Sequence, residues 1–474
     1  MNSIAPLRVT AERLHPRDAV FVYDETDRHL SNIVAVYAFD ASDADPLTAD
    51  QVLDWVQARL GHAKLFHRRL QRLPLDLDLP YWVPDPILGL RDHVSLTAPG
   101  TWSDVRSKVG EIASTRMDLS RPPWEIHIMD QVREVPGFPA EATFVVLKFH
   151  HSVGDGVATR ELELKLFGNV PLPPPAQLHP RWPTPTTALR TADALTLGTL
   201  RFATGLHRTR TAATEVGTLT NSGQLHPPLP HRPATRFNRP IHHPLTFDLV
   251  TLPLAEILKA KANSPTRITL NDLMLATISG ALSAYLAEKG ESPAGSLAAM
   301  VPMSMRPLTT WTSANQLVQM YVDLHTNIPN PLERLHAIQR SATAEKHRNS
   351  TPAVLATESR VETSPSWLLR LAGWARSQRD FEAAQTVPLV NTTISNVPPI
   401  ATTLEFCGRP IARIFGVLPT MDGDGLRHLI TSQGDEIVIS FSTDATMMPD
   451  PDHYAVLLLD SFRALTASFT ATRR

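Results

Sequence analysis

The chain has 474 residues, of which 42% are hydrophobic, and this is enough to bury a large core and to form two or more domains. Its 45 Lys and Arg residues nearly balance 47 Asp and Glu residues, and the net charge of -2 gives no overall field that would attract nucleic acid. A single cysteine, Cys407, excludes an intramolecular disulfide and any metal site made of cysteines alone.

The N-terminal stretch has no apolar segment of the length found in signal peptides, and nowhere do about 18 consecutive apolar residues occur, as a membrane span requires. We therefore expect a protein that is cytoplasmic or peripheral on a membrane. The stretch around Cys407, LEFCGRP, offers the thiol no neighbouring base, so a small semi-buried filler is a better interpretation than a nucleophile.

The first part of the chain, residues 19–167, alternates two kinds of pattern. NIVAVYAF (32–39) and TFVVLKF (143–149) are typical of buried strands, whereas residues 49–70 have helical periodicity throughout. Such alternation favours an α/β or α+β layered fold.

Two proline-rich segments, 169–186 and 225–240, cannot sustain helix or central-strand hydrogen bonding. Between them, residues 187–216 carry Leu, Phe and Arg at helical spacing, so a helix is predicted that either packs against the body or lies on its outside against lipid. The predicted division is an N-terminal domain (1–175), a proline-flanked connector with a helix (176–235) and a C-terminal domain (236–474).

The second half again mixes helices and strands. Residues 270–290 are predicted to form a helix, LAAMVPMSM (297–305) a strand, and 426–444 a hairpin that turns at 433–435. No sequence repeat joins the halves, so any symmetry between them is structural only.

The stretch VLKFHHSVGDGV contains the most informative residues. If the strand continues through both histidines, His151 shares the apolar face of Phe149, while His150 points the other way. A histidine at the end of an apolar stripe is held neutral by its surroundings, and a neutral imidazole can act as a general base. Asp155 could orient an imidazole or pair with an arginine, and Gly156 leaves room for a ligand or backbone.

Three interpretations of this stretch remain open from the residues alone: packing in a core or loop, general-base chemistry, and metal binding. The metal interpretation is the weakest, because adjacent strand residues face opposite directions and one cation could not easily bind both histidines.

His-His-x-x-x-Asp-Gly, here His150, His151, Asp155 and Gly156, resembles the signature of the acyltransferase superfamily that includes chloramphenicol acetyltransferases, carnitine acyltransferases and peptide-synthetase condensation domains. Over nearly its whole length the chain is similar to one branch, the bacterial wax ester synthase/diacylglycerol acyltransferase family. The stretches that carry this resemblance, in the family's order and spacing, are HPRDAVF (15–21), HRRLQRLPLDLDLPYWVPDP (67–86), RPPWEIHIMD (121–130), NDLMLATISGAL (271–282), VPMSMRP (301–307), ANQLVQM (314–320) and ISNVPP (394–399). Departures from the family pattern are Pro123, Ala314 and Pro399, which bear on substrate preference more than on chemistry.

The resemblance implies an α/β (α+β) fold of two chloramphenicol acetyltransferase-like domains, each a mixed sheet flanked by helices, with the active site at their interface. It implies transfer of a long-chain fatty acyl group from acyl-CoA to diacylglycerol, to a long-chain alcohol, or to both. His151 would be the general base, and Asp155 would brace the loop more than carry protons. His150 would hold the backbone or line the channel.

For the oxyanion of the tetrahedral intermediate, Asn271 is the predicted donor. The alternative is that Asn271 and Asp272 only begin a helix, since both are good N-caps. Trp124, which follows Pro123, is expected in the core more than at a ligand, and Arg306 either pairs with Asp155 or is solvated.

The family's reaction requires no cofactor and no metal, since acyl-CoA is itself the substrate. Its lipid substrates imply peripheral contact with the inner face of a membrane or with lipid droplets. The basic residues Lys64, Arg68, Arg69 and Arg72 would suit CoA phosphates or an anionic membrane, or would form a solvated helix face.

Two rival functions stay open. One is a condensation-type acyltransferase that uses carrier-protein thioesters, although no carrier domain is fused here. The other is a lipid-binding or lipid-droplet protein with the same fold and no turnover.

Overall fold

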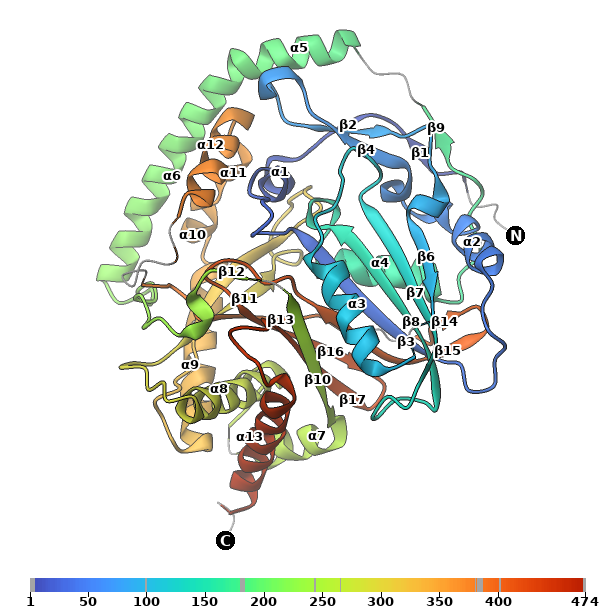
Figure 1. The fold of residues 1–474 in the computed structure, drawn as a ribbon. Coiled ribbons are helices and arrows are strands. Elements are labelled where there is room, and N and C mark those ends of the chain that lie inside the picture. Colours follow the sequence, from blue (N-terminus) through green and yellow to red (C-terminus); the bar gives the residue numbers. More distant parts are fainter. Residues whose placement is uncertain are drawn as a thin grey trace.

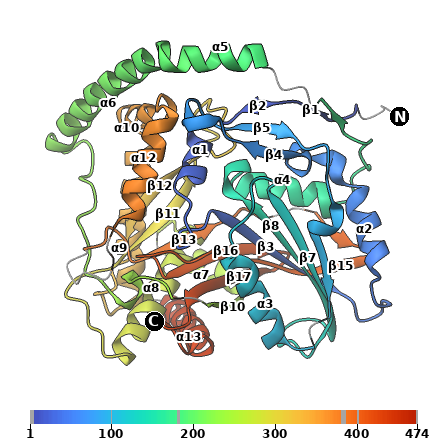
Figure 2. The ribbon, with the colours of Figure 1, turned by 45° about the horizontal axis from the view of Figure 1, so that its top comes forward.

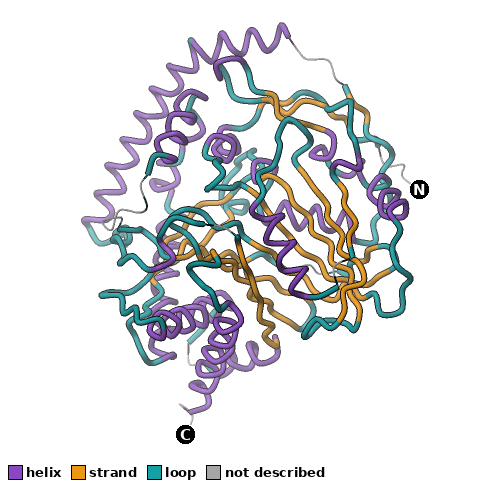
Figure 3. The backbone as a smooth tube through the Cα atoms, in the orientation of Figure 1, coloured by secondary structure: helices purple, strands orange, loops and turns teal. Residues whose placement is uncertain are grey.

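The computed structural model describes residues 5–98, 100–179, 184–242, 244–264, 266–379, 381, 387–399 and 402–471. Two six-stranded mixed sheets dominate the structure, and they lie side by side with helices around them (Figures 1 and 3). This is the α/β architecture of two sheet-and-helix halves that the sequence predicts.

The first sheet holds the histidine motif. Its strands, in spatial order, are β14 (Glu405–Phe406), β15 (Arg409–Val417), β3 (Asn32–Asp40), β8 (Glu141–His150), β7 (Trp124–Arg133) and β6 (Val94–Thr97). Neighbouring strands are antiparallel except β6 and β7, which are parallel. Because β14 and β15 come from the C-terminal half, the two halves of the chain are joined through a continuous sheet.

The second sheet has the order β10 (Leu245–Pro253), β17 (Glu436–Asp444), β16 (Leu426–Gln433), β13 (Thr392–Asn396), β11 (Ala298–Ser304) and β12 (Leu317–Asp323). The hairpin β16–β17 turns at Gly434 and Asp435, with Gly434 at a φ of 57°, so the predicted hairpin is confirmed. Four helices cover this sheet: α7 (Leu254–Asn263), α8 (Leu270–Glu288), α9 (Pro331–Ser350) and α13 (Pro451–Ala471). In the described part of the chain, α8 alone is long and apolar enough to cross a membrane, but 67% of its apolar window is buried in this core.

Helices on both faces of the first sheet complete its two cores. Apolar residues of α2 (Ala49–Gln57) and α4 (Gly156–Phe167) pack on the face of β8 that carries Val145, Leu147 and Phe149. Residues of α3 (Trp102–Ser114) pack on the other face together with Phe247 of β10 and Val438 of β17, so this second core also joins the two sheets.

The predicted helix over residues 49–70 is wrong beyond Gln57. Short 3-10 turns follow, and β4 (Arg68–Gln71) pairs with β5 (Tyr81–Pro84), which also pairs with β2 (Glu12–Arg13). The basic run is therefore not a helix face. Lys64 and Arg68 both pair with Glu12, and Arg72 pairs with Asp76.

The connector forms two long helices, α5 (Thr184–Leu195) and α6 (Leu197–Asn221), which run along the outside of the molecule (Figures 1 and 2). The connector is tied in before α5 by β9 (Gln177–Leu178), which pairs with β1 (Arg8–Val9). Buried Gly205 and Ala212 face the body, where α6 packs against α10 (Pro352–Thr357) and α11 (Ser359–Glu362). The alternative in which this helix packs on the body therefore holds for α6.

Two further helices contact each other, and the first of them packs against the turn of the histidine motif. The helix α1 (Pro16–Tyr23) packs against α12 (Ser366–Ser377) at Gly373, where a Cβ atom would lie 2.1 Å from the Tyr23 carbonyl oxygen. Only glycine permits this close approach.

Candidate active site

The histidine motif lies where β8 leaves the first sheet. His150 is the last residue of the strand, and its backbone N–H donates to the Pro123 carbonyl (3.1 Å). His151 donates its backbone N–H to the Ser31 carbonyl (2.7 Å) and begins a 3-10 turn, residues 151–153. The expectation that the strand continues through His151 is thus corrected, since His151 begins a turn. Its side chain lines an apolar cavity between the halves that includes Ile33 and Ala35 of β3, which pack with Phe149.

Glycines make the following turn possible. A Cβ at position 154 would lie 2.7 Å from the Ala158 Cβ, a distance that side chains do not tolerate. At Gly156 a Cβ would lie 3.4 Å from Val397 of the C-terminal half, so the start of α4 approaches that half closely. What approaches Gly156 in the structure is therefore a side chain of the other half.

Asp155 caps α4 and joins it to the C-terminal half. Its carboxylate accepts hydrogen bonds from the backbone N–H groups of Val157 and Ala158 and from that of Gln316 (3.1, 3.2 and 3.0 Å). Arg306 donates two hydrogen bonds to the same carboxylate, each 2.9 Å. Burial opposes ionisation of Asp155, but these donors outweigh it and hold the pKa of the carboxyl below its usual range.

Of the two roles considered for Arg306, pairing with Asp155 is the one the structure forms. No hydrogen bond joins Asp155 to either histidine ring among the described residues, so its carboxylate fixes the loop and leaves the imidazoles free of it.

His151 is held between the two halves. Phe21 of α1 stacks on its ring, with centroids 4.2 Å apart and an interplanar angle of 7°. From the other side, the Asn315 side-chain amide donates to the His151 carbonyl (2.8 Å). Burial lowers the pKa of His151 to about 4, so the ring is neutral near pH 7.

His150 points away from His151 and into a polar cluster. Its Nδ1 lies 2.6 Å from the Ser152 hydroxyl, and its Nε2 lies 3.5 Å from Glu25 Oε1. Burial favours the neutral form of Glu25, but hydrogen bonding and charge from His150, with further donors, lower the pKa of this carboxyl overall. The side chain of His150 therefore stabilises the turn through its contacts with Ser152 and Glu25.

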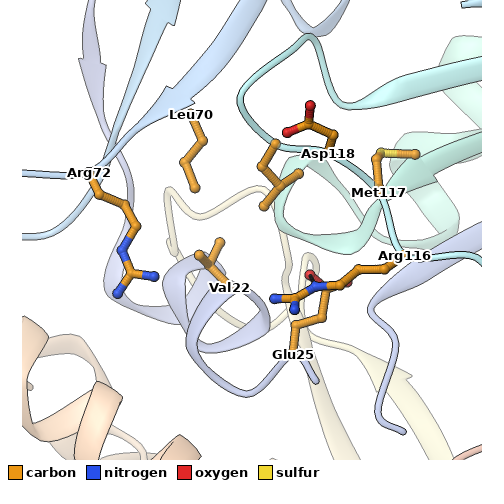
Figure 4. Close-up of a pocket in the computed structure, with 8 residues that line it drawn as sticks. Val22, Glu25, Leu70, Arg72, Arg116, Met117 and Asp118 are labelled. Carbon is orange, nitrogen blue, oxygen red and sulfur yellow. Dashed lines mark hydrogen bonds and ion pairs between the residues drawn. The ribbon is translucent and has the colours of Figure 1, made fainter. Parts of the chain in front are cut away.

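Two cavities flank this cluster. A cavity of about 80 Å³ contains His151, Gly156 and Arg160, together with Ser395 and mostly apolar side chains of β3, β15 and β16. A larger one, about 310 Å³, lies beside α1 and is lined by Glu25, Val22, Leu70, Arg72 and Arg116 with their neighbours (Figure 4). Glu25 thus connects the second cavity to His150.

One wall of the smaller cavity is a buried polar cluster. Arg160 donates to the Pro398 carbonyl (2.9 Å) and to Glu163 (2.5 Å), and the Tyr37 hydroxyl donates to Glu163 (2.5 Å). Since Pro398 belongs to the C-terminal half, Arg160 also fixes the two halves together beside His151.

The remaining predicted residues lie outside this centre. Trp124 is fully buried, stacks on His93 and meets Phe66 edge-on, so it belongs to the core as expected. Asp272 closes a capping box with Thr269, the N-cap of α8, and Asn271 follows that cap. Asn271 does not line the cavity of His151, so no contact in the structure supports its predicted oxyanion role.

Metal and thiol chemistry gain no support from the arrangement of side chains. Among the described residues no group of three His, Cys, Asp or Glu side chains could hold a metal ion. Burial raises the pKa of Cys407 to about 11, which keeps it a thiol.

Several residues at the centre were not singled out as site residues by the sequence. Phe21 and Glu25 contact the histidines from more than 120 positions away, which no local pattern reveals. Asn315 and Gln316 were visible only as part of the stretch ANQLVQM, and Asp18 was visible only within HPRDAVF. The Asp18 carboxylate accepts hydrogen bonds from the backbone N–H groups of Ala314 and Asn315 and from the side-chain amide of Asn315. These bonds hold α1 against the stretch ANQLVQM.

Replacing Phe21 by leucine is expected to remove the stacking contact but keep an apolar side chain. An aromatic pair of this kind contributes about 0.5–1.5 kcal/mol, so the ring of His151 should sample other orientations and kcat should fall by roughly tenfold. The measurement is steady-state turnover together with Tm. Phe202→Leu on α6 is the matched control, and equal rates for both variants would contradict the role of Phe21.

The comparisons with known proteins agree with this geometry. The family described as wax ester synthase/diacylglycerol acyltransferase catalytic domain matches residues 14–274, and the WS/DGAT C-terminal domain matches residues 313–466. A Mycobacterium tuberculosis (strain ATCC 25618 / H37Rv) protein named as a diacylglycerol O-acyltransferase is 29% identical, with 95% of each chain covered. A second from that strain is 25% identical over 94% of this chain and 93% of its own.

Solved structures share the fold at low sequence identity. A wax ester synthase/diacylglycerol acyltransferase from Marinobacter aquaeolei VT8 superposes with a TM-score of 0.64 at 22% identity, covering 97% of this chain and 100% of that one. A trichothecene 15-O-acetyltransferase from Fusarium sporotrichioides gives a TM-score of 0.59 at 11% identity, covering 96% and 95%. With the intact His-His-x-x-x-Asp-Gly turn at the junction of two such halves, the chain belongs to the wax ester synthase/diacylglycerol acyltransferase family of O-acyltransferase enzymes.

Proposed function

We propose that this enzyme transfers a long-chain fatty acyl group from acyl-CoA to the hydroxyl of diacylglycerol, giving triacylglycerol, or of a long-chain alcohol, giving a wax ester. The observation that carries the proposal is a neutral imidazole, His151, in an apolar cavity between the two halves of the fold. A neutral alcohol is a poor nucleophile, and a buried neutral base is what it needs.

In the proposed mechanism His151 takes the proton of the acceptor hydroxyl as its oxygen bonds to the thioester carbonyl carbon. The tetrahedral intermediate then collapses, the carbon–sulfur bond breaks, and His151 returns the proton to the departing thiolate. The products are an ester and free CoA, and the balance needs neither a covalent enzyme intermediate nor a cofactor or metal ion.

The other residues of the motif act by positioning. Asp155 and Arg306 hold the turn, His150 supports it through Ser152 and Glu25, and Phe21 with Asn315 orients His151. For the oxyanion, Asn271 remains a prediction from resemblance. Ser395, which lines the same cavity as His151, is a second candidate for this donor.

We further propose that the enzyme works in the cytoplasm, peripheral on the inner face of a membrane or on lipid droplets, because its substrates reside there. The net charge of -2 gives no reason to expect a nucleic-acid partner.

The test is ester formation by the purified protein from a long-chain acyl-CoA, with diacylglycerol and a long-chain alcohol offered separately. Formation of either ester supports the proposal, and the better acceptor identifies the main reaction. If acyl-CoA binds and neither acceptor is esterified, a carrier-dependent condensation or a non-catalytic lipid-binding role replaces it.

The pH dependence offers a second test. Because burial lowers the pKa of His151 to about 4, kcat/KM is expected to stay level from near neutral pH down to about pH 5 and to fall only as the pH passes through about 4. An unperturbed histidine would give a fall near its ordinary value of 6.5. The profile should be recorded with circular dichroism at each pH, since acidification also lowers stability when a histidine is buried neutral.

A further inference from the structure

The helix α12 exposes its largest apolar side chains to solvent. Trp367, Leu371 and Trp374 are 56%, 50% and 60% exposed, and they recur at a spacing of four and three residues, which places them on one stripe of the helix. With Arg370 on the same stripe, we call this set the outer face of α12. A continuous exposed stripe with two tryptophans marks an interaction surface more than an ordinary solvated helix.

The orientation of α12 is fixed by its opposite side. Leu369 and Gly373 are buried toward α1, and Ser366 is buried against the Asp76 carbonyl. Position 373 allows no side chain because the Tyr23 carbonyl lies too close. The tryptophans therefore cannot rotate into the core, and their exposure is a property of the packed helix.

The loop of residues 73–79 extends this surface. Leu75 is 84% exposed with a φ of 57°, and Leu77 is 40% exposed. Between them, Asp76 accepts a hydrogen bond at its carbonyl from the Ser366 hydroxyl (2.5 Å) and one at its carboxylate from Arg370 (3.1 Å). The two leucines thus flank a residue that is bonded to α12.

Charge on this surface favours an anionic partner. Arg72 and Arg370 share the single carboxylate of Asp76, which leaves a surplus positive charge. Arg376 pairs with Asp24, and Arg379 beyond the helix end is exposed. The helix α12 itself has no acidic residue.

The surface also lies close to the catalytic centre. Arg72 lines the cavity of about 310 Å³ beside α1 (Figure 4), and α1 carries Phe21 against His151. A lipid at this surface would thus be near the cavity whose Glu25 side chain contacts His150.

We propose that the outer face of α12, together with Leu75 and Leu77, docks the enzyme on an anionic lipid surface. Tryptophans and leucines would insert at the level of the lipid headgroups while the arginines meet anionic headgroups, as in interfacial amphipathic helices. This docking proposal rests on the proposed function in one respect: an enzyme with lipid substrates has to meet a lipid surface.

The experiment measures binding without turnover. Purified wild type and the double variant Trp367→Ser/Trp374→Ser are floated with vesicles of phosphatidylcholine alone and with added phosphatidylglycerol. Wild type is expected to bind the anionic vesicles and to be released by salt, and loss of both indoles should weaken that binding by about tenfold or more. Arg379→Gln should weaken binding to the anionic vesicles only.

The matched control is Leu258→Ser/Val456→Ser, which removes two exposed apolar side chains from α7 and α13 at the other end of the molecule (Figure 1). This control should float like wild type. Equal flotation of the tryptophan variant and wild type would overturn the proposal, as would a wild type that binds neither vesicle.

Two further measurements are needed. One distinguishes docking on a lipid surface from docking on a second copy of the chain, and the other separates a loss of binding from a loss of turnover. Light scattering of wild type and tryptophan variant would reveal a dimer that the substitutions dissociate, and that result would assign the surface to a second copy of the chain instead. Turnover of a short-chain acyl-CoA and a water-soluble alcohol should be equal in both proteins. Absence of ester formation from a long-chain acyl-CoA in wild type would refute the proposed function and leave the vesicle result standing.

Discussion

Replacing His151 by alanine is expected to lower kcat by about 10²–10⁴-fold, the usual loss when a general base is removed. The imidazole accepts the hydroxyl proton in the proposed mechanism, and no other titratable side chain among the described residues shares its cavity except Arg160 and Glu163. Those two are engaged with each other and with Pro398 and Tyr37. No neighbour should therefore replace the missing base.

The same substitution should leave the fold nearly unchanged. The Nδ1 atom of His151 is buried and has no hydrogen-bond partner in the described part of the chain, so its loss strands no other polar group. Because the stacking contact with Phe21 is lost, Tm of His151→Ala should fall by no more than a few degrees. Tm of His207→Ala, an exposed control on α6, should equal that of wild type. A folded His151→Ala variant with turnover within twofold of wild type would exclude His151 as the base.

His150→Ala should behave differently, although the two histidines are adjacent. His150 is fully buried and contacts Ser152 and Glu25, so its removal leaves a buried carboxylate with fewer donors. A loss of stability is expected first, and any loss of turnover should follow from the displaced loop.

Predictions from the sequence were best for helices, strands and turns whose defining residues are close together in the chain. The alternation of TFVVLKF was sufficient for β8, the Gln-Gly-Asp turn for the β16–β17 hairpin, and the apolar run after Thr269 for α8. Here the residues that define the element and those that stabilise it are close in the sequence, so periodicity and turn residues suffice.

The wrong predictions concern residues whose partners are distant. Helical spacing continues beyond Gln57, but pairing of β4 with β5 and the close approach of Gly61 to the Pro174 carbonyl decide in favour of turns and a strand. Likewise, Lys64 and Arg68 of the basic run share the carboxylate of Glu12, a partner more than 50 positions earlier that no local pattern reveals. Tertiary pairing overrides local preference in both cases.

The candidate site was predicted in part for the same reason. The motif indicated His151 and the turn that carries it, because those residues are consecutive. Its partners were beyond a local pattern: Phe21 precedes it by 130 positions and Asn315 follows it by 164. Only the family resemblance connected the stretches that contain them.

Breaking the pair between Asp155 and Arg306 is expected to have the largest effect on stability. Removing one partner of a fully buried ion pair costs about 3–5 kcal/mol. Asp155 is 2% exposed and the Arg306 side chain is 28% exposed, so the cost here should lie at or below the lower end of that range. Asp155→Ala should be the most damaging substitution, because it also leaves the N–H groups of Val157, Ala158 and Gln316 without an acceptor. Arg306→Ala should cost less, since those three donors still stabilise the carboxylate.

Asp155→Asn separates charge from shape. The amide oxygen can still cap α4, so this variant should lose mainly the charge-assisted bonds to Arg306. Because the pKa of Asp155 is lowered in the folded protein, its ionised form stabilises the fold above the unfolded pKa of about 3.9, and that contribution is lost as the pH falls through the lower folded pKa. The difference in unfolding free energy between wild type and Asp155→Asn should thus be constant above about pH 5 and shrink below it.

Urea unfolding of wild type, Asp155→Asn, Arg306→Ala and the double variant forms a double-mutant cycle for this pair. A coupling free energy of at least about 1 kcal/mol is expected, because the two side chains share two hydrogen bonds. If the changes in unfolding free energy of the two single variants simply add in the double variant, Asp155 and Arg306 do not stabilise each other. If coupling is found, turnover should fall in both single variants. The acid limb of kcat/KM should not move above about pH 4 in Asp155→Asn, because the Asp155 charge raises the pKa of His151 and its removal can only lower it.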